Sequence, residues 1–108
     1  MSRIVVMNSA VMPNDGTYVC KYVDSETFKK AFHKAYEKSK SFESTIGYQE
    51  TADLLTELLG VEVPMNRVNT SLKSGDIMFV VRSTQRFDPD KKGLEHLSSV
   101  VFAIIKFK

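Results

Sequence analysis

The sequence predicts a single α/β domain in which helices flank a mixed β-sheet. The chain has 108 residues, enough for one hydrophobic core and too few for a second. Short runs of β-branched and aromatic residues near both ends are typical of strands. Two amphipathic segments lie between those runs and indicate helices that cover a sheet. We therefore treat residues 1–108 as one domain.

The first strands are expected close to the N-terminus. Ile4–Met7 is a short apolar run and predicts a strand, and residues 17–23 predict a second. The loop between them contains Pro13, Asn14, Asp15 and Gly16. Cys20, the only cysteine, cannot form a disulfide within the chain, and we interpret it as a small core residue.

Two helices follow the second predicted strand. Asp24 or Ser25 is suited to cap the first helix. Its apolar side chains recur at helical spacing and are Phe28, Ala31, Phe32, Ala35 and Tyr36. Lysines dominate its other face, and we interpret them as solvated because no aromatic residue lies between them to stack on bases. A second helix is expected over residues 48–59, and Gly60 suits its C-terminal end.

The second half of the chain contains three further predicted strands. They are expected at residues 61–68, 77–81 and 100–105. The first is interrupted by Pro64, whereas the other two are apolar almost throughout, which predicts buried strands. Residues 94–97 predict one helical turn before the last strand.

The composition limits the possible ligands and partners. A net charge of +2 is low for a protein that tracks a long nucleic acid. No apolar run approaches the ~18 residues that a membrane-spanning helix needs. Metal-ligand spacings and nucleotide-binding glycine motifs are absent from the sequence, and His33 and His96 stand alone. We therefore expect a cytoplasmic protein that uses no metal or other cofactor and binds a small anion.

Polar residues follow two of the predicted strands. Asn8 and Ser9 come directly after the first strand, and Arg82 and Arg86 come after the strand at 77–81. Ligands of open α/β sheets collect beyond the carboxyl ends of strands. An arginine side chain suits phosphate because its planar guanidinium donates two parallel hydrogen bonds.

The start of the second predicted helix adds further candidates for an anion site. Gly47 and Tyr48 lie there, where free backbone N–H groups can bind an anion and a glycine permits close approach. Together with Arg67, these residues predict one phosphate pocket. The spacing is equally consistent with the alternative that the arginines are ordinary surface residues, namely Arg67, Arg82 and Arg86.

Short motifs along nearly the whole chain resemble one family in their order and spacing. The early motifs are Asn8-Ser9-Ala10-Val11 and Gly16-Thr17-Tyr18. The middle motifs are Ser44-Thr45-Ile46-Gly47, Thr51-Ala52, Leu54-Leu55 and Leu59-Gly60-Val61. The later motifs are Pro64-Met65-Asn66-Arg67, Gly75-Asp76 and Arg86. With these motifs the sequence resembles the anti-CRISPR ring nucleases, small viral and mobile-element proteins that act against type III CRISPR systems.

The resemblance implies a homodimer that holds its ligand at the dimer interface. The implied ligand is cyclic tetra-adenylate, the messenger that activates CRISPR ancillary nucleases, and a two-fold dimer suits a ring that can adopt two-fold symmetry. The implied ligand-binding positions are Asn8, Ser9, Thr51, Arg67 and Arg86. In the implied reaction, which needs no metal, a ribose 2′-hydroxyl attacks the neighbouring phosphate and leaves a 2′,3′-cyclic phosphate. Arg86 would stabilise the charge on that phosphate.

Three positions depart from the family pattern. The proton donor of the family is a histidine directly after an Ile-Gly pair, and Tyr48 occupies that position. A phenol is a weaker acid than an imidazolium near neutral pH, and general acid catalysis is typically worth ~10²–10⁴-fold. Phe87-Asp88-Pro89-Asp90 replaces a glutamate-glycine pair, so that Asp88 or Asp90 is the acidic residue there. Arg82 replaces a neutral polar residue.

Three functions are compatible with these residues. The first is a ring nuclease with Tyr48 or His96 as the acid. The second is a sponge that sequesters the cyclic nucleotide without cleaving it. The third is a regulatory or interaction protein that retains only the scaffold. For a protein encoded by a virus or mobile element, the expected location is the cytoplasm of the host cell.

Overall fold

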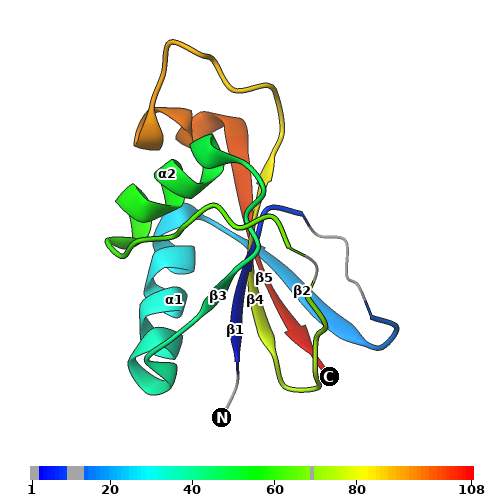
Figure 1. The fold of residues 1–108 in the computed structure, drawn as a ribbon. Coiled ribbons are helices and arrows are strands. Elements are labelled where there is room, and N and C mark those ends of the chain that lie inside the picture. The colour runs from blue at the N-terminus through cyan, green and yellow to red at the C-terminus, as the bar shows by residue number, and fades with distance from the viewer. Residues whose placement is uncertain (1–2, 10–13, 69) are drawn as a thin grey trace.

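The computed structural model describes residues 3–9, 14–68 and 70–108. Pro13 of the predicted loop and the Ala10-Val11 pair of the first motif lie outside these described residues. In chain order the elements are β1 (Ile4–Met7), β2 (Tyr18–Val23), α1 (Ser25–Ser39), β3 (Glu43–Ser44), α2 (Gln49–Leu59), β4 (Ile77–Ser83), the 3₁₀ helix η1 (Gly93–Ser99) and β5 (Val100–Phe107). Figure 1 shows their arrangement. The predicted α/β fold with one mixed sheet is confirmed.

The five strands form one sheet in the order β2-β5-β4-β1-β3. β1 is parallel to β3 and β4, whereas β5 is antiparallel to both β4 and β2. The strands β1 to β4 therefore all run in one direction and end together. We call the edge where they end the carboxyl edge of the sheet, and the opposite one the amino edge.

Both α-helices cover the same face of the sheet (Figure 1). Phe28 and Phe32 of α1 pack there with the leucines of α2 and with Phe79 of β4. The rings of Phe28 and Phe32 meet the ring of Phe79 edge to face, with centroids 5.5 and 5.4 Å apart. On the other face a smaller cluster that includes Met78 and Val80 is covered by Leu72. The main core thus lies between the helices and the sheet.

The ends of α1 and α2 follow from their sequences. The Asp24 side chain accepts a hydrogen bond from the Thr27 N–H at 2.7 Å and caps α1. Hydrogen bonding from the side chain and the backbone N–H of Thr27 lowers the pKa of Asp24 below its ordinary value. Gly60 ends α2 in the left-handed conformation with φ 73°, as predicted. Tyr48 precedes the first turn of α2 as its cap residue and lies outside the helix proper.

Residues 61–68 do not form the predicted strand, and β3 takes the fifth place in the sheet instead. Pro64 in that segment lacks the N–H group that a strand ladder requires. The segment lies beside β3 and the residues after it. Ser44 Oγ donates to the Pro64 carbonyl at 2.6 Å, and the Asn66 N–H donates to the Ile46 carbonyl at 2.8 Å. The two residues of β3 were predicted as part of a polar connection, because their strand pairing depends on β1.

Two further predictions are wrong. Cys20 is exposed and is not a core residue, because β2 is an edge strand and most of its residues remain open to solvent. Arg82 lies within β4 and not after it, since β4 continues to Ser83 by pairing with the start of β5. Its register partner there is Val101.

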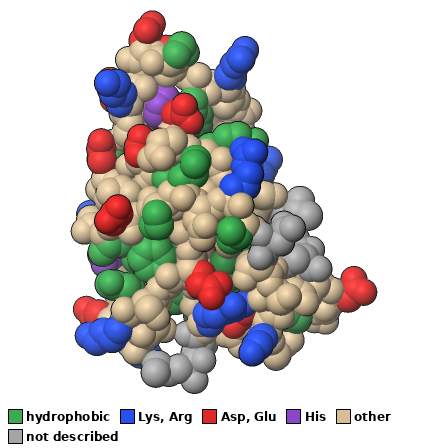
Figure 2. All heavy atoms as spheres, viewed as in Figure 1, with side chains coloured by type: hydrophobic (Ala, Val, Ile, Leu, Met, Phe, Trp, Pro, Cys, Tyr) green, Lys and Arg blue, Asp and Glu red, His purple; other side chains and the backbone are tan. Residues whose placement is uncertain are grey.

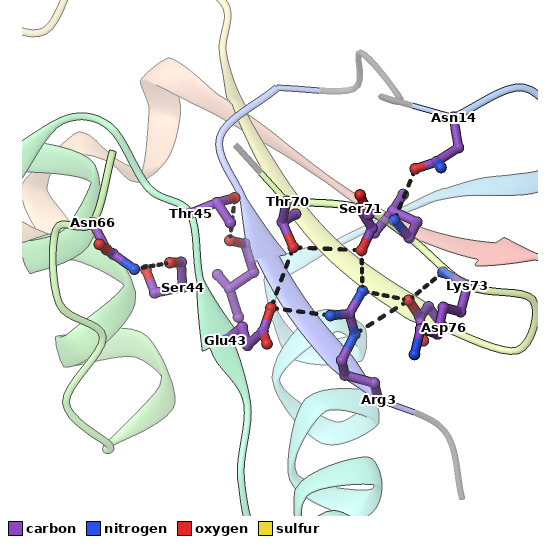
Figure 3. A network of polar contacts seen from close by, with 12 residues as sticks. Arg3, Asn14, Glu43, Ser44, Thr45, Asn66, Thr70, Ser71, Lys73 and Asp76 are labelled. Carbon is purple, nitrogen blue, oxygen red and sulfur yellow. Dashed lines mark hydrogen bonds and ion pairs between the residues drawn. The ribbon is translucent and has the colours of Figure 1, made fainter. Parts of the chain in front are cut away.

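A polar network closes the amino edge of the sheet (Figure 3). The guanidinium of Arg3 donates to Asp76 Oδ2 through Nη2 at 2.7 Å and through Nε at 3.2 Å. It also contacts Glu43 at 3.3 Å and the Ser71 carbonyl. Asp76 is 4% exposed and accepts a further bond from the Lys73 N–H at 2.8 Å. The hydrogen bond to Asp76 raises the pKa of Arg3, and the network fixes the connection before β4 against β1.

Candidate functional site

The carboxyl edge brings the end of β1 next to the residues between β3 and α2. The Thr45 N–H and hydroxyl both donate to the Val6 carbonyl, at 2.9 and 3.1 Å. Farther along, Asn8 Oδ1 accepts a hydrogen bond from the Gly47 N–H at 3.2 Å. The sequence predicted one polar pocket from Asn8 after the first strand and Gly47 at the start of the second helix, and the hydrogen bond brings these two residues together.

Arg67 lies on the other side of the same glycine. Its Nη2 donates to the Gly47 carbonyl at 3.0 Å, so that side chains hold both backbone polar groups of Gly47. The guanidinium carbon lies 5.2 Å from the ring centroid of Tyr48, within the range of a cation–π contact. A Cβ at position 47 would lie 3.2 Å from Arg67 Nε, so any larger residue there would require the Arg67 side chain to shift slightly. We call Asn8, Gly47, Tyr48 and Arg67 the Gly47 cluster.

Tyr48 presents its ring to solvent at the start of α2. The residue is 57% exposed, and its phenol has no hydrogen bond to any described residue. No side chain caps the helix at this end. The first N–H groups of α2 therefore remain able to receive an anion beside the Gly47 cluster. Thr51, in the first turn, is 7% exposed and packs inward.

Arg82 and Arg86 form a second basic region at the carboxyl edge. Arg82 is exposed and lines a cleft of about 590 Å³ that includes Tyr22, Asp24 and Ser25. Arg86 is exposed in the segment after β4. Within the described parts of the chain, neither guanidinium forms a hydrogen bond or ion pair, so their donors are available to a ligand. No such bond links them to the Gly47 cluster, and the predicted residues thus form two groups.

Comparison with known proteins places this architecture in a family. The model of the STIV B116-like family matches residues 4–101, which is most of the chain. The chain belongs to the STIV B116-like family.

Two viral proteins are similar to this B116-like chain. "Uncharacterized protein 26" of Sulfolobus islandicus filamentous virus (isolate Iceland/Hveragerdi) is 29% identical over 108 residues, covering 97% of this chain and 90% of that protein. The solved structure of B116 of Sulfolobus turreted icosahedral virus superposes with a TM-score of 0.79 at 17% identity. That superposition covers 97% of this chain and 99% of the viral protein. The family is thus one of small viral proteins, and the fold is shared along almost the whole chain.

His96 of the B116-like chain is a packed residue. It is 1% exposed, and its ring stacks on Phe87 with centroids 4.2 Å apart and an interplanar angle of 12°. Its Nδ1 is buried without a hydrogen-bond partner among the described residues. Because His96 is enclosed, Tyr48 is the better placed of the two candidate acids. Asp88 is exposed and forms a turn, accepting from the Asp90 N–H at 2.9 Å.

Acidic side chains lie over α2 on the face shown in Figure 2. Glu50, Asp53 and Glu57 are exposed there and line a cleft against η1 that also contains Lys91 and Lys92. The Gly47 cluster is not part of that cleft, and its own charged group is Arg67. Over the described residues, no three metal-ligating side chains are arranged to hold an ion, and no helix is long and apolar enough to cross a bilayer.

Two features of the site were not predicted from the sequence. Arg67 was predicted only to bind ligand, yet it also fixes Gly47 and covers the Tyr48 ring. Tyr22 was not singled out, yet it lines the cleft of Arg82. The alternation of residues along a strand could have indicated this second feature. Tyr22 pairs with Ala103 and Arg82 pairs with Val101, which places both side chains on one face of the sheet.

Proposed function

We propose that this protein binds a cyclic oligoadenylate, cyclic tetra-adenylate in particular, as a homodimer and so counters type III CRISPR signalling. The observation that carries the proposal is the Gly47 cluster at the carboxyl edge, with Gly47 held between Asn8 and Arg67 beside an uncapped helix start. The motif resemblance points to the same function, and membership of a family of small viral proteins is compatible with it.

The arrangement suits a ring of phosphates better than a single small anion. The start of α2 offers backbone donors for one phosphate. Arg82 and Arg86 offer guanidinium forks for others, and neither is engaged by a described residue. A two-fold dimer would present two copies of each group, which matches a cyclic ligand with repeated phosphates.

Cleavage of the ring is a second activity of the same site. The ligand's 2′-hydroxyl gives its proton to solvent water as its oxygen attacks the adjacent phosphorus, and the bond from phosphorus to the 5′-oxygen breaks. Arg86 stabilises the charge on the phosphoryl oxygens, and the Tyr48 phenol donates a proton to the leaving 5′-oxygen. Turnover is slow, because a phenol is a poorer proton donor near neutral pH than the family's histidine.

The alternative is a sponge that binds the ring and leaves it intact. One observation favours this alternative: the Tyr48 phenol has no hydrogen-bond partner among the described residues and is 57% exposed. Arg67 contacts the ring, but no described group forms a hydrogen bond to the phenol or relays a proton to it. A sponge needs only the binding groups of the site.

The test is to titrate the purified protein with cyclic tetra-adenylate in the presence of a chelator. Calorimetry should give one ring bound per two chains, with linear tetra-adenylate as the control ligand bound more weakly. Chromatography of the mixture then separates the two activities, since 2′,3′-cyclic phosphate products identify a nuclease and intact ring identifies a sponge. If the folded protein does not bind cyclic tetra-adenylate, the proposal is overturned. The protein would then be a scaffold that recognises another partner.

A further inference from the structure

A second concave site lies at the amino edge, on the helix-covered face of the sheet. It is a groove of about 410 Å³ between the C-terminal half of α1 and the first residues of β1 and β4. Ile4, Ile77, Phe79 and Ile104 line its sheet side. We call it the α1 groove. The proposed cyclic oligoadenylate site lies at the opposite edge and shares no lining residue with it.

The groove exists because α1 carries short side chains where it passes this part of the sheet. Phe28 and Phe32 anchor the helix in the core, whereas Ala31 and Ala35 line the groove and reach less far toward the strands. Ile77 and Ile104 therefore remain only half-buried. A groove of this volume is within the range of about 300–1,000 Å³ that is usual for small-molecule sites.

Apolar surface continues from the groove onto β2. Val19 is 47% exposed and pairs directly with Lys106 in the antiparallel ladder. Directly opposite residues of such a ladder point to the same face of the sheet. Val19 therefore lies diagonally across from Ile104 on the same face, whereas Lys21 is the residue directly opposite Ile104.

The rim of the groove is basic. Lys34 and Lys38 lie one turn apart on α1, and Lys106 comes from β5. No acidic residue lines the groove, and none of these lysines pairs with an acid in the described ranges of the chain. A lysine in the last turn of a helix suits the helix dipole, which accounts for Lys38 but not for Lys106 on a strand. The convergence of cations from two elements thus requires another reason.

We propose that the α1 groove binds a fatty acid, with the alkyl chain along the apolar floor and the carboxylate among the rim lysines. Lysine stems pack on apolar surface while their ammonium groups reach outward, which suits this position of the head group. The volume is near the lower end of the ligand-site range and favours one chain over the two chains of a diacyl lipid. A nucleotide fits less well, because its sugar would lie against isoleucine and phenylalanine side chains.

The first test is calorimetry with hexanoate, octanoate and decanoate below the concentrations at which they form micelles. Each added methylene should tighten binding about two- to fourfold, because burial of one methylene contributes on that order. Decyltrimethylammonium carries the same chain on a cationic head and should bind at least about tenfold more weakly than decanoate. Equal affinity for the two head groups, or no dependence on chain length, would overturn the proposal.

Variants locate the site. Ala35→Leu places a larger side chain in the groove and should reduce decanoate affinity more than about tenfold. The double variant Lys38→Glu with Lys106→Glu should do the same without changing the groove's shape. Lys30→Glu, at a position on α1 that does not line the groove, is the matched control and should bind decanoate as the parent protein does.

Circular dichroism and thermal melting check that each variant is folded. If Ala35→Leu misfolds, the lysine double variant still decides the question. Unchanged affinity in a folded groove variant, or an equal loss in Lys30→Glu, would place the fatty acid elsewhere. Binding of cyclic tetra-adenylate is measured separately, and its failure leaves this inference unaffected because the two sites lie at opposite edges.

Discussion

The two edges of the sheet use their charged side chains in opposite ways. At the amino edge, Arg3 is matched to Asp76 and Glu43 in the network shown in Figure 3. At the carboxyl edge, Arg82 and Arg86 have no partner in the described parts of the chain. Matched groups fix a connection in place, whereas unmatched groups are open to a ligand. The difference separates an arginine engaged in ion pairs from two arginines whose guanidinium groups are unpaired among the described residues.

The largest expected effect tests the carboxyl edge as a catalytic site. Tyr48→His restores the proton donor of the resembling family and should raise ring cleavage by ~10²–10⁴-fold over the parent protein. Single-turnover chromatography of cyclic tetra-adenylate products measures this rate. Leu94→His is the control, because Leu94 is exposed on η1 and lies outside both the Gly47 cluster and the cleft of Arg82, and it should give no gain. A Tyr48→His protein no faster than its parent would remove Tyr48 from the reaction.

Next in size is a loss of stability at the amino edge. Asp76→Ala leaves the Arg3 guanidinium and the Lys73 N–H without their acceptor, and should lower the free energy of unfolding by about 2–4 kcal/mol. Urea denaturation measures the change. Asp15→Ala removes an exposed carboxylate and should change stability by no more than about 0.5 kcal/mol. Similar losses in both variants would show that the network contributes little.

Arg86→Ala should weaken binding of the cyclic ligand and change the free energy of unfolding little, in contrast to Asp76→Ala. Removing a charged donor to phosphate should weaken ring binding about ten- to a hundredfold, because hydrogen bonds to charged groups contribute about 1.5–3 kcal/mol. Arg86→Lys keeps the charge and loses the planar fork, so its affinity should lie between those of the parent and Arg86→Ala. Calorimetry with cyclic tetra-adenylate measures these affinities. An Arg86→Ala protein that binds the ring as tightly as its parent would exclude Arg86 from the site.

The smallest expected effect concerns Asp24, an acidic side chain at the carboxyl edge that is already engaged as a helix cap. Its pKa is lowered in the folded protein, so its ionised form stabilises α1 above the unfolded pKa. That contribution is lost as the pH falls through the lowered pKa. Asp24→Asn keeps a good capping residue and does not titrate. Thermal melts should therefore show the Asp24→Asn protein less stable than its parent at pH 7 by a few degrees at most, with the difference shrinking as the pH falls through the lowered pKa of Asp24. A constant difference at all pH values would contradict the assignment.

Local patterns were sufficient to predict most of the fold. The four apolar residues of β1, the capped and amphipathic α1 and the glycine after α2 are each encoded within a few residues. β3 was missed because its two residues have no pattern of their own and pair only where β1 offers a free edge. Cys20 was misplaced because the sequence does not show that β2 lies at the edge of the sheet.

The candidate site was predicted only in part, because some of its contacts follow from local sequence patterns and others depend on the tertiary fold. The position of Asn8 after the first strand and of Gly47 at the start of the second helix was enough to predict that the two residues share a pocket. It could not predict that Arg67 would contact the Tyr48 ring, because that contact depends on where the irregular segment 61–68 lies. Nor could it predict the burial of His96, which depends on how η1 packs against α2 and on the stacking of Phe87.

β1 reaches from the amino edge to the carboxyl edge with only four residues. Arg3 immediately precedes it and Asn8 immediately follows it. An extended chain rises ~3.3 Å per residue, which places their backbones about 16 Å apart on a single rigid segment. The two ends therefore cannot slide independently. A shift in the register of β1 would displace Arg3 from Asp76 and Asn8 from Gly47 in the same movement. A pairing error in this one strand would therefore disrupt the contacts at both edges of the sheet.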